Sequence, residues 1–193
     1  MKVFIFSSIY FPYKAGTAVS VRQVAHKLAE KNLEITVITC NTHKSLNQEI
    51  DQDVRVIRLN CWNSRYLNYS YPIPKPSAVI SCWQLLKKNK PDIVSIQTRF
   101  YLTSLLGFIF GKINKVPVIL FEYGGAPVMN ESKFITFCSR IVDSSLGWLL
   151  CRYSDLVVCL SENCRPFLKK LGACNITVIP FGIDNDFWKI EPK

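Results

Sequence analysis

An acid, a phenol and two glycines follow one another at Glu122, Tyr123, Gly124 and Gly125, directly after the apolar run PVILF. Glu122 could orient a hydroxyl or act as a base, and Tyr123 could donate a hydrogen bond. The glycines would let a ligand approach the backbone closely. A strand end with a glycine turn explains the same letters, so the sequence leaves both interpretations open.

A second candidate site is the stretch SSIYFPYKAGTAVS, residues 7–20, which contains one glycine. Neither G-x-G-x-x-G nor G-x-x-x-x-G-K-[ST] is present, which argues against a nicotinamide-dependent dehydrogenase and a P-loop enzyme. Gly16 stands before an amphipathic pattern, where backbone N–H groups can approach a phosphate. Thr17 is expected to cap that helix. A turn glycine with no ligand explains Gly16 equally well.

Ser161 and Glu162 follow the apolar run DLVVCL, at a predicted strand-to-helix junction. Ser161 suits an N-cap, and an acid in the first turn suits the helix dipole. The structural interpretation is the stronger one here. Glu162 is kept as a candidate substrate-binding residue because of its place at a strand end.

The long connection 60–75 combines aromatic and basic residues, and we interpret it as a binding loop. Its candidate contact residues are Trp62, Arg65, Tyr66 and Tyr69. Such a mixture suits a membrane interface, a sugar or stacked bases. Packing of the loop back onto the sheet is an equally good explanation.

Neither a metal site nor a Ser/His/Asp triad can be assembled from this composition. There are two histidines, and carboxylates do not cluster. His26 lies on the polar side of the first helical pattern, where we expect a solvated surface position, and His43 sits in a polar stretch. The eight cysteines form no C-x-x-C pair, so we expect reduced, structural cysteines in a cytosolic protein.

Apolar runs and helical patterns alternate along the 193 residues. The predicted strands cover 2–7, 34–39, 54–59, 92–96, 117–121, 155–160 and 176–180. The predicted helices cover 17–32, 76–90, 100–112, about 130–153 and 161–171. Uniformly apolar strands are typical of a parallel sheet that is covered on both faces. We therefore predict an α/β fold: a doubly wound, mostly parallel Rossmann-like sheet of about six or seven strands, with ligands at the carboxyl ends of the strands.

The charge balance favours an anionic partner, because 24 Lys and Arg residues face 14 Asp and Glu residues, for a net charge of +10. No recognition motif supports a nucleic acid, so an anionic membrane surface or a phosphorylated small molecule remains. The longest nearly uncharged apolar stretch, 100–110, is shorter than the ~20 residues that span a bilayer. With no visible secretory signal, we expect a cytoplasmic protein, with peripheral attachment to the inner face of the membrane as an open alternative.

Six segments resemble, in order, the retaining GT-B glycosyltransferases of the large family 4 type. They are KVFIFSSIYFPYKAGTAVSVRQVAHKLAEKNLEITVIT, VRVIRL, KPDIVSIQ, VPVILFEYGG, YSDLVVCLSE and ITVIPFGIDNDF. Each segment is degenerate, but six in sequence form a specific signal. The resemblance covers nearly the whole chain and the first half of the family's architecture.

This resemblance implies that residues 1–180 form the N-terminal, acceptor-side Rossmann-like domain, and that 181–193 begin the interdomain linker with the donor-binding domain absent. The implied reaction transfers a sugar from a nucleotide-sugar donor to a glycan or lipid-linked acceptor, with retention, as in polysaccharide or lipopolysaccharide biosynthesis. The nucleotide sugar is a co-substrate, and no metal or further cofactor is implied. The implied substrate-binding residues are Gly16, Thr17, Glu122, Tyr123, Gly124 and Glu162, and no catalytic residue is assigned.

The sequence departs from the family pattern at three places. Ala15 stands where the family often has glycine, the segment Ser95–Gln97 lacks a histidine, and Tyr123 takes the place of a histidine. A phenol is a poor substitute for imidazole near pH 7. We therefore expect a half that is inactive alone and needs a donor-binding domain or chain. The alternative is a non-catalytic module that binds a glycan or glycolipid.

Overall fold

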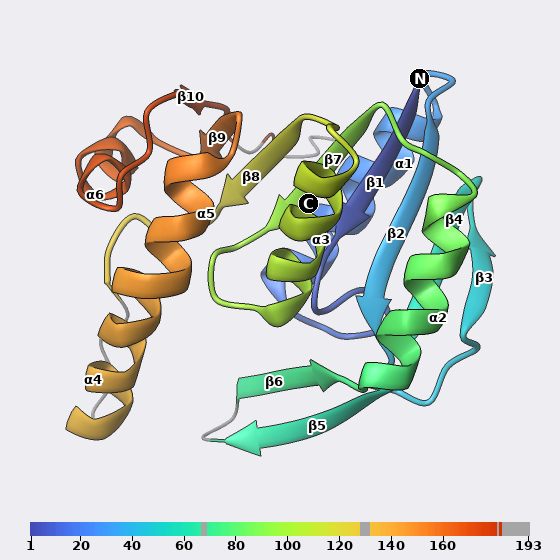
Figure 1. Cartoon of the computed structure of the whole chain (residues 1–193), viewed down its shortest axis with the longest axis horizontal. Coiled ribbons are helices and arrows are strands. Elements are labelled where there is room, and N and C mark those ends of the chain that lie inside the picture. The colour runs from blue at the N-terminus through green and yellow to red at the C-terminus, as the bar shows by residue number, and fades with distance from the viewer. Residues whose placement is uncertain (67–68, 128–131, 181, 183–193) are drawn as a thin grey trace, which may run out of the picture.

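The computed structural model describes residues 1–66, 69–127, 132–180 and 182. Of residues 64–66 and 69–70 it describes the backbone alone. Helices lie on both faces of an eight-stranded sheet, and a two-stranded hairpin stands apart from it (Figure 1). The sheet has the order β10-β9-β8-β7-β1-β2-β4-β3. Every neighbouring pair is parallel except β3 and β4. The predicted doubly wound, mostly parallel fold is confirmed.

The strands of the sheet are β1 (Lys2–Phe6), β2 (Glu34–Cys40), β3 (Gln48–Asp51), β4 (Val54–Leu59), β7 (Ile93–Gln97), β8 (Val118–Glu122), β9 (Leu156–Cys159) and β10 (Ile176–Val178). The hairpin consists of β5 (Cys61–Tyr66) and β6 (Tyr69–Pro74). The helices are α1 (Gly16–Ala29), α2 (Pro76–Lys87), α3 (Leu102–Ile113), α4 (Lys133–Val142), a π-helical turn η1 (Asp143–Gly147), α5 (Trp148–Tyr153), a 3₁₀ turn η2 (Glu162–Cys164) and α6 (Arg165–Lys170).

Alternation along the strands divides the interior into two cores. Val3 and Ile5 of β1 face α1, whereas Phe4 and Phe6 face the larger core under α2, α3 and α5. Helix α3 packs so closely that a Cβ added at Gly107 would lie 2.6 Å from the Phe6 ring. Burial of both faces explains why the parallel strands read as continuous apolar runs.

The strand count was predicted too low. Strand β3, with the polar sequence QEID, pairs antiparallel with β4 and forms an edge of the sheet. The connection 60–75, predicted as a loop, is the β5–β6 hairpin, with Cys61 opposite Pro74 and Tyr66 opposite Tyr69. Alternating aromatic residues favour such pairing, and prolines are tolerated where no ladder N–H is needed.

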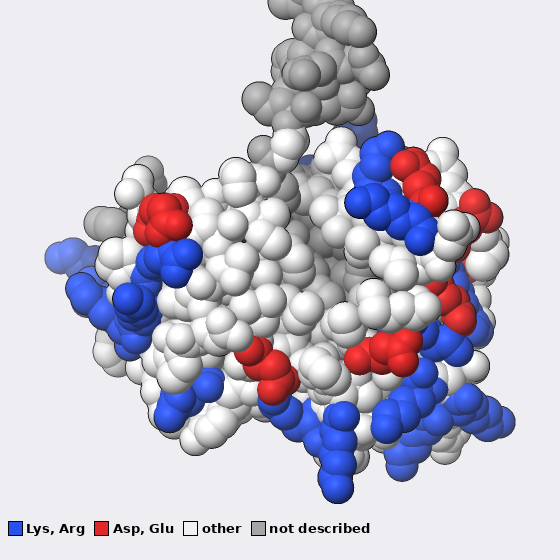
Figure 2. Space-filling model, turned by 90° about the horizontal axis from the view of Figure 1, so that it is seen from above, with Lys and Arg blue, Asp and Glu red and all other residues white. Residues whose placement is uncertain are grey.

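Coverage of the α1 face is incomplete. Helix α1 lies over β1, β2 and β4, and a hollow of about 200 Å³ remains between it and the neighbouring strands. Mostly apolar side chains line this hollow, among them Val24 of α1, Ile93 of β7, and Ile119 and Phe121 of β8. Figure 2, which looks down on Figure 1 from above, shows a hollow among uncharged atoms, with Lys and Arg gathered toward the margins.

The last long helix runs from Lys133 to Tyr153, close to the predicted 130–153, through α4, η1 and α5. Its second half is anchored, because Leu150 and Cys151 are fully buried. Its first half extends away from the sheet (Figure 1), and α4 has no buried residue. Among the described residues, this helix alone is long and apolar enough to cross a membrane, judged by length and composition.

Candidate functional site

The strand order reverses between β1 and β7, from which the chain continues outward in both directions. Ligands of open α/β sheets bind at the carboxyl ends of the strands beside such a switch point. The arrows of β1 and β2 point to the lower edge of the sheet in Figure 1, so the switch-point loops lie there. Ser8, after β1, shares a 2.7 Å hydrogen bond with Thr103 of α3 across this point.

The N-terminus of α1 opens onto this edge. Ala15, with extended backbone, is the N-cap residue, and neither a side-chain cap nor an acid occupies the first turn. Thr17 is the second helical residue, so the prediction that it caps the helix is wrong. Gly16 is exposed, and no atom lies within 4 Å of the position that a Cβ would take there. This end of a 14-residue helix can receive an anion on its first N–H groups.

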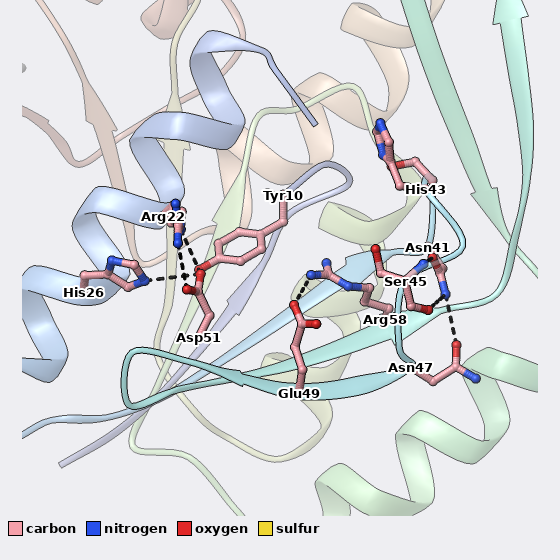
Figure 3. Close-up of polar contacts among 11 residues, drawn as sticks. Tyr10, Arg22, His26, Asn41, His43, Ser45, Asn47, Glu49, Asp51 and Arg58 are labelled. Atoms are coloured by element: carbon pink, nitrogen blue, oxygen red, sulfur yellow. Dashed lines mark hydrogen bonds and ion pairs between the residues drawn. The ribbon is translucent and has the colours of Figure 1, made fainter. Parts of the chain in front are cut away.

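A polar network holds the loop that leads to Gly16 (Figure 3). Asp51 of β3 accepts hydrogen bonds from Tyr10 Oη at 3.0 Å and from Arg22 Nε and Nη2 at 2.8 Å each. The hydrogen bonds from Arg22 are the main cause that lowers the pKa of Asp51 to about 2. Burial, reinforced by Asp51, raises the pKa of Tyr10. The network ties the β1 loop, α1 and β3 to one carboxylate.

His26 belongs to the same network, with Nε2 3.2 Å from Asp51 Oδ2. Its side chain is 15% exposed, so the expected solvated position is wrong. Periodicity placed His26 on the polar side of α1, but the antiparallel edge strand β3 covers that side. Arg58 of β4 forms a second ion pair with Glu49 of β3 beside it (Figure 3).

Glu122 lies at the end of β8 and is buried. One carboxylate oxygen accepts from the Arg99 N–H and the other from the Gly124 N–H, both at 3.0 Å. Arg99 Nη1 lies 2.8 Å from Glu122 Oε1 as an ion pair. Burial raises the pKa of the Glu122 carboxyl, and Arg99 offsets part of that effect. In this structure, Glu122 positions the backbone of the FEYGG loop.

Arg99 was not among the predicted site residues, although it is the best connected side chain of this edge. It is fully buried, donates from Nε to Asp143 Oδ1 at 2.6 Å, and donates from Nη2 to the Ala126 carbonyl at 3.3 Å. Its guanidinium also lies over the rings of Phe100 and Phe167. One feature of the sequence could have indicated Arg99: it is a charged residue between the apolar strand 92–96 and the apolar helical stretch 100–112.

Tyr123 continues the polar chain into β7. Its hydroxyl donates to Gln97 Oε1 at 2.6 Å, and Gln97 Nε2 donates to Ser95 Oγ at 2.8 Å. Burial raises the pKa of Tyr123, so the phenol is a hydrogen-bonding group and not a base near neutral pH. Ser95 and Gln97 also line the hollow beside α1.

Thr98 follows β7 at the switch point and has a left-handed backbone, with φ of 61°. That conformation is strained for a β-branched residue. The Thr98 N–H donates to the Phe121 carbonyl at 2.8 Å, which holds it in place. Its buried hydroxyl has no hydrogen-bond partner among the described residues. No sequence signal marks this residue.

Glu162 lies after β9, and its side chain is 70% exposed. It forms a 2.5 Å ion pair with Arg165 and stays accessible at the carboxyl edge. Ser161 precedes η2 but provides no cap, because its hydroxyl lies 3.3 Å from Cys164 Sγ instead. A Cβ at Gly125 would lie 2.7 Å from that sulfur, so the FEYGG loop packs directly against η2.

The hairpin carries the remaining predicted residues. Trp62 is exposed, and Lys75 Nζ lies 6.0 Å from its ring centroid. Tyr71 holds the hairpin to the α3 start, because its hydroxyl donates to the Phe100 carbonyl at 2.5 Å and its ring stacks on Tyr101. The side chains of Arg65, Tyr66 and Tyr69 lie outside the described residues.

Among the described residues, no three His, Cys, Asp or Glu side chains are grouped to hold a metal ion. All eight cysteines are free, and four of them belong to the larger core. At the carboxyl edge, the described residues therefore offer the first N–H groups of α1, the exposed carboxylate of Glu162, the chain of hydrogen bonds through Tyr123 and Gln97, and the exposed His43, which follows β2 and packs against Tyr13.

The sequence model of Glycosyltransferase Family 4 matches residues 15–187. The chain belongs to glycosyltransferase family 4. An uncharacterized glycosyltransferase of Methanocaldococcus jannaschii, MJ1069, is 32% identical over 175 residues. That match covers 87% of this chain and 44% of MJ1069, so this family 4 chain spans less than half of its relative.

Solved structures share the fold with this family 4 chain. Sucrose-phosphate synthase from Thermosynechococcus elongatus superposes with a TM-score of 0.68 at 15% identity, over 96% of this chain and 49% of that one. MurG from Acinetobacter baumannii gives 0.52 at 15% identity, over 84% and 42%. A putative UDP-N-acetylglucosamine 2-epimerase from Listeria monocytogenes gives 0.59 at 16% identity, over 92% and 44%. The chain thus has the fold of one GT-B half.

Proposed function

We propose that this domain is the acceptor-binding half of a retaining glycosyltransferase. A nucleotide sugar is the donor, and the acceptor is a glycan or a lipid-linked saccharide. A second Rossmann-like half binds most of the donor, whether it belongs to the same polypeptide or to a separate one. The domain alone is inactive, because the donor grip and the acceptor site lie on different halves.

The observation that supports this proposal is the open N-terminus of α1 at the switch point. Its first N–H groups are uncapped by side chains, an acid is absent from the first turn, and space is open beside Gly16. The partial positive charge at a helix start favours a diphosphate. Positioning and stabilisation of the leaving diphosphate are then the main contributions of this half to catalysis.

The other edge residues divide into two roles under this proposal. Glu162 offers a carboxylate to sugar hydroxyls, since it is exposed, and the absence of a side chain at Gly124 lets a sugar approach the loop backbone. Glu122 accepts a hydrogen bond from the Gly124 N–H and so holds the loop backbone, whereas the Tyr123 hydroxyl donates to Gln97 Oε1 and so fixes the Gln97 side chain. A cytoplasmic location, at the inner face of a membrane, suits a nucleotide-sugar donor and a lipid-linked acceptor.

The deciding experiment is reconstitution with a donor-binding half, measured as sugar transfer from a nucleotide-sugar panel. The pair should transfer sugar with retained anomeric configuration, and the domain alone should not. Gly16→Asp should lower transfer by the pair at least tenfold, because an anion at the helix start repels the diphosphate. An acid in a first turn suits the helix dipole, so this variant should keep the parent melting temperature.

Asn32→Asp is the matched control, because it adds the same charge beyond the other end of α1. Asp tolerates the left-handed backbone at position 32 as Asn does, and the control should transfer sugar like the parent. Full transfer by Gly16→Asp, or robust transfer by the domain alone, would contradict the proposal.

A second candidate function is a glycan- or glycolipid-binding module without turnover. It is favoured by the engagement of Glu122 and Tyr123 within the protein, because neither side chain is then free to act as a base at the carboxyl edge. Glycan binding by the domain alone, with no transfer in any pairing, would select this function over the first.

A further inference from the structure

Helix α4 carries an apolar seam that the rest of the described protein does not cover. Phe134 and Phe137 are 74% and 61% exposed, and Ile141 is also exposed. Residues at i, i+3 and i+7 lie on one side of a helix, so these three side chains form one line along α4. Water-exposed aromatic rings in a row are costly unless another surface covers them.

The exposed charges along the helix Lys133–Tyr153 are all positive. Lys133, Arg140 and Arg152 are exposed, whereas the single acid between Lys133 and Tyr153 is Asp143, which is buried against Arg99. On a helical projection, Lys133 and Arg140 flank the seam on its polar side. Long basic side chains at that position can reach phosphate headgroups while the seam enters the acyl region.

The anchoring of α5 decides between lying on a bilayer and crossing it. Asp143, Leu150 and Cys151 are buried in the domain, which fixes the second half of the helix to the sheet. Polar residues Thr136 and Ser139 lie on the side of α4 away from the seam. A helix with one apolar side, one cationic side and an anchored end lies in the interface plane.

We propose that α4 is a membrane-interface helix, whose Phe134–Phe137–Ile141 seam enters the surface of an anionic lipid bilayer. The β5–β6 hairpin, with exposed Trp62, and α4 both extend toward the bottom of Figure 1, where the carboxyl edge of the sheet lies. Docking through α4 therefore brings the carboxyl edge toward the lipid surface. The proposal concerns attachment, so it can stand or fall independently of sugar transfer.

The test is flotation of the chain with vesicles of phosphatidylglycerol and phosphatidylcholine, compared with phosphatidylcholine alone. The chain should bind the anionic vesicles, more tightly at low salt. Phe134→Ser/Phe137→Ser should weaken binding at least tenfold, because two aromatic anchors are lost. Both rings are exposed, so the melting temperature should stay unchanged.

Ile80→Ser/Ile113→Ser is the matched control. These side chains are 59% and 62% exposed but lie on α2 and at the α3 end, away from the seam. The control should bind like the parent. Lys133→Gln/Arg140→Gln should flatten the salt dependence, whereas Lys31→Gln/Lys90→Gln, which removes two exposed cations elsewhere, should not.

A tryptophan placed in the seam provides a direct readout of insertion. The fluorescence that Phe137→Trp adds should be quenched by brominated lipid in the anionic vesicles. Unchanged binding by the Phe134→Ser/Phe137→Ser variant would overturn the proposal. So would loss of self-association, and not of vesicle binding, in that variant, because the seam would then belong to a contact between two copies.

Discussion

At the residue scale, Arg99 is shared by two carboxylates, Glu122 and Asp143, that come from different parts of the chain. All three side chains are buried, so their charges are compensated by one another and not by water. Removal of the guanidinium leaves two carboxylates in an apolar setting. Breaking a buried ion pair from one side is costly for that reason.

We therefore expect Arg99→Met to destabilise the fold by about 3–5 kcal/mol. Arg99→Lys should recover little of this, because a single ammonium cannot reproduce the planar set of donors. The measurement is urea unfolding followed by circular dichroism. Arg140→Met, which removes an exposed arginine from α4, is the control and should change stability by less than ~0.5 kcal/mol. A loss below about 1 kcal/mol for Arg99→Met would refute the assigned role.

At the element scale, the edge strand β3 is held to α1 by Asp51. Its sequence, QEID, has neither the apolar run nor the β-branched bias of the other strands. Its place depends on the antiparallel ladder with β4 and on charge pairing with Arg22, which is 29 residues away in the sequence. Both are long-range interactions, so local pattern could not reveal the strand.

The pH dependence of Asp51→Asn follows from the lowered pKa of Asp51. A carboxyl with a folded pKa of about 2 and an unfolded value near 4 stabilises the fold above pH 4. That stabilisation is lost as the pH falls through about 2. At pH 7 the variant should lose between about 1 and 3 kcal/mol, and its difference from the parent should shrink between pH 4 and pH 2.

Unfolding curves from pH 7 to pH 2 measure this difference directly. Asp53→Asn changes an exposed residue in the turn between β3 and β4 and should stay within ~0.5 kcal/mol of the parent throughout. If the free energies of unfolding of Asp51→Asn and the parent differ by the same amount at pH 2 as at pH 7, the carboxylate charge does not hold β3 in place.

The parallel strands and the main helices could be predicted because their signals are local. PVILF and DIVSI are apolar on both faces, and α1 repeats its apolar residues at helical spacing. Gly124 and Glu162 could be placed at the carboxyl edge because each follows a predicted parallel strand. The engagement of Arg99 with Asp143 could not be predicted, because it joins residues 44 positions apart through tertiary packing. The strain at Thr98 is likewise set by its neighbours and leaves no trace in composition.

At the scale of the whole molecule, the apolar hollow beside α1 leaves part of the sheet face without a covering helix. Its lining includes Ile119 and Phe121, both half-buried. Sheets of this class normally bury both faces under helices. The family 4 relative is more than twice as long as the segment matched here, so its further residues are available to cover such a surface.

The hollow should bind an apolar dye such as anilinonaphthalene sulfonate in the native state. Val24→Glu, in the hollow wall, should weaken that binding at least tenfold, because a carboxylate replaces apolar surface there. Val19→Glu adds the same charge to an exposed part of α1 outside the lining and should leave dye binding unchanged. Equal effects of the two variants, measured by fluorescence titration, would mean that the dye binds elsewhere.

The π-helical turn at Asp143–Gly147 gives the arginine linkage a mechanical meaning. The turn lies where Arg99 meets the helix, and a Cβ at Gly147 would lie 3.3 Å from Arg99 Cδ. Through Arg99 and Glu122, the same contact reaches the Gly124 N–H. One unbroken chain of contacts thus links the helix Lys133–Tyr153 to the loop at the end of β8, and we expect a displacement of the helix at Asp143 to be transmitted to the backbone at Gly124.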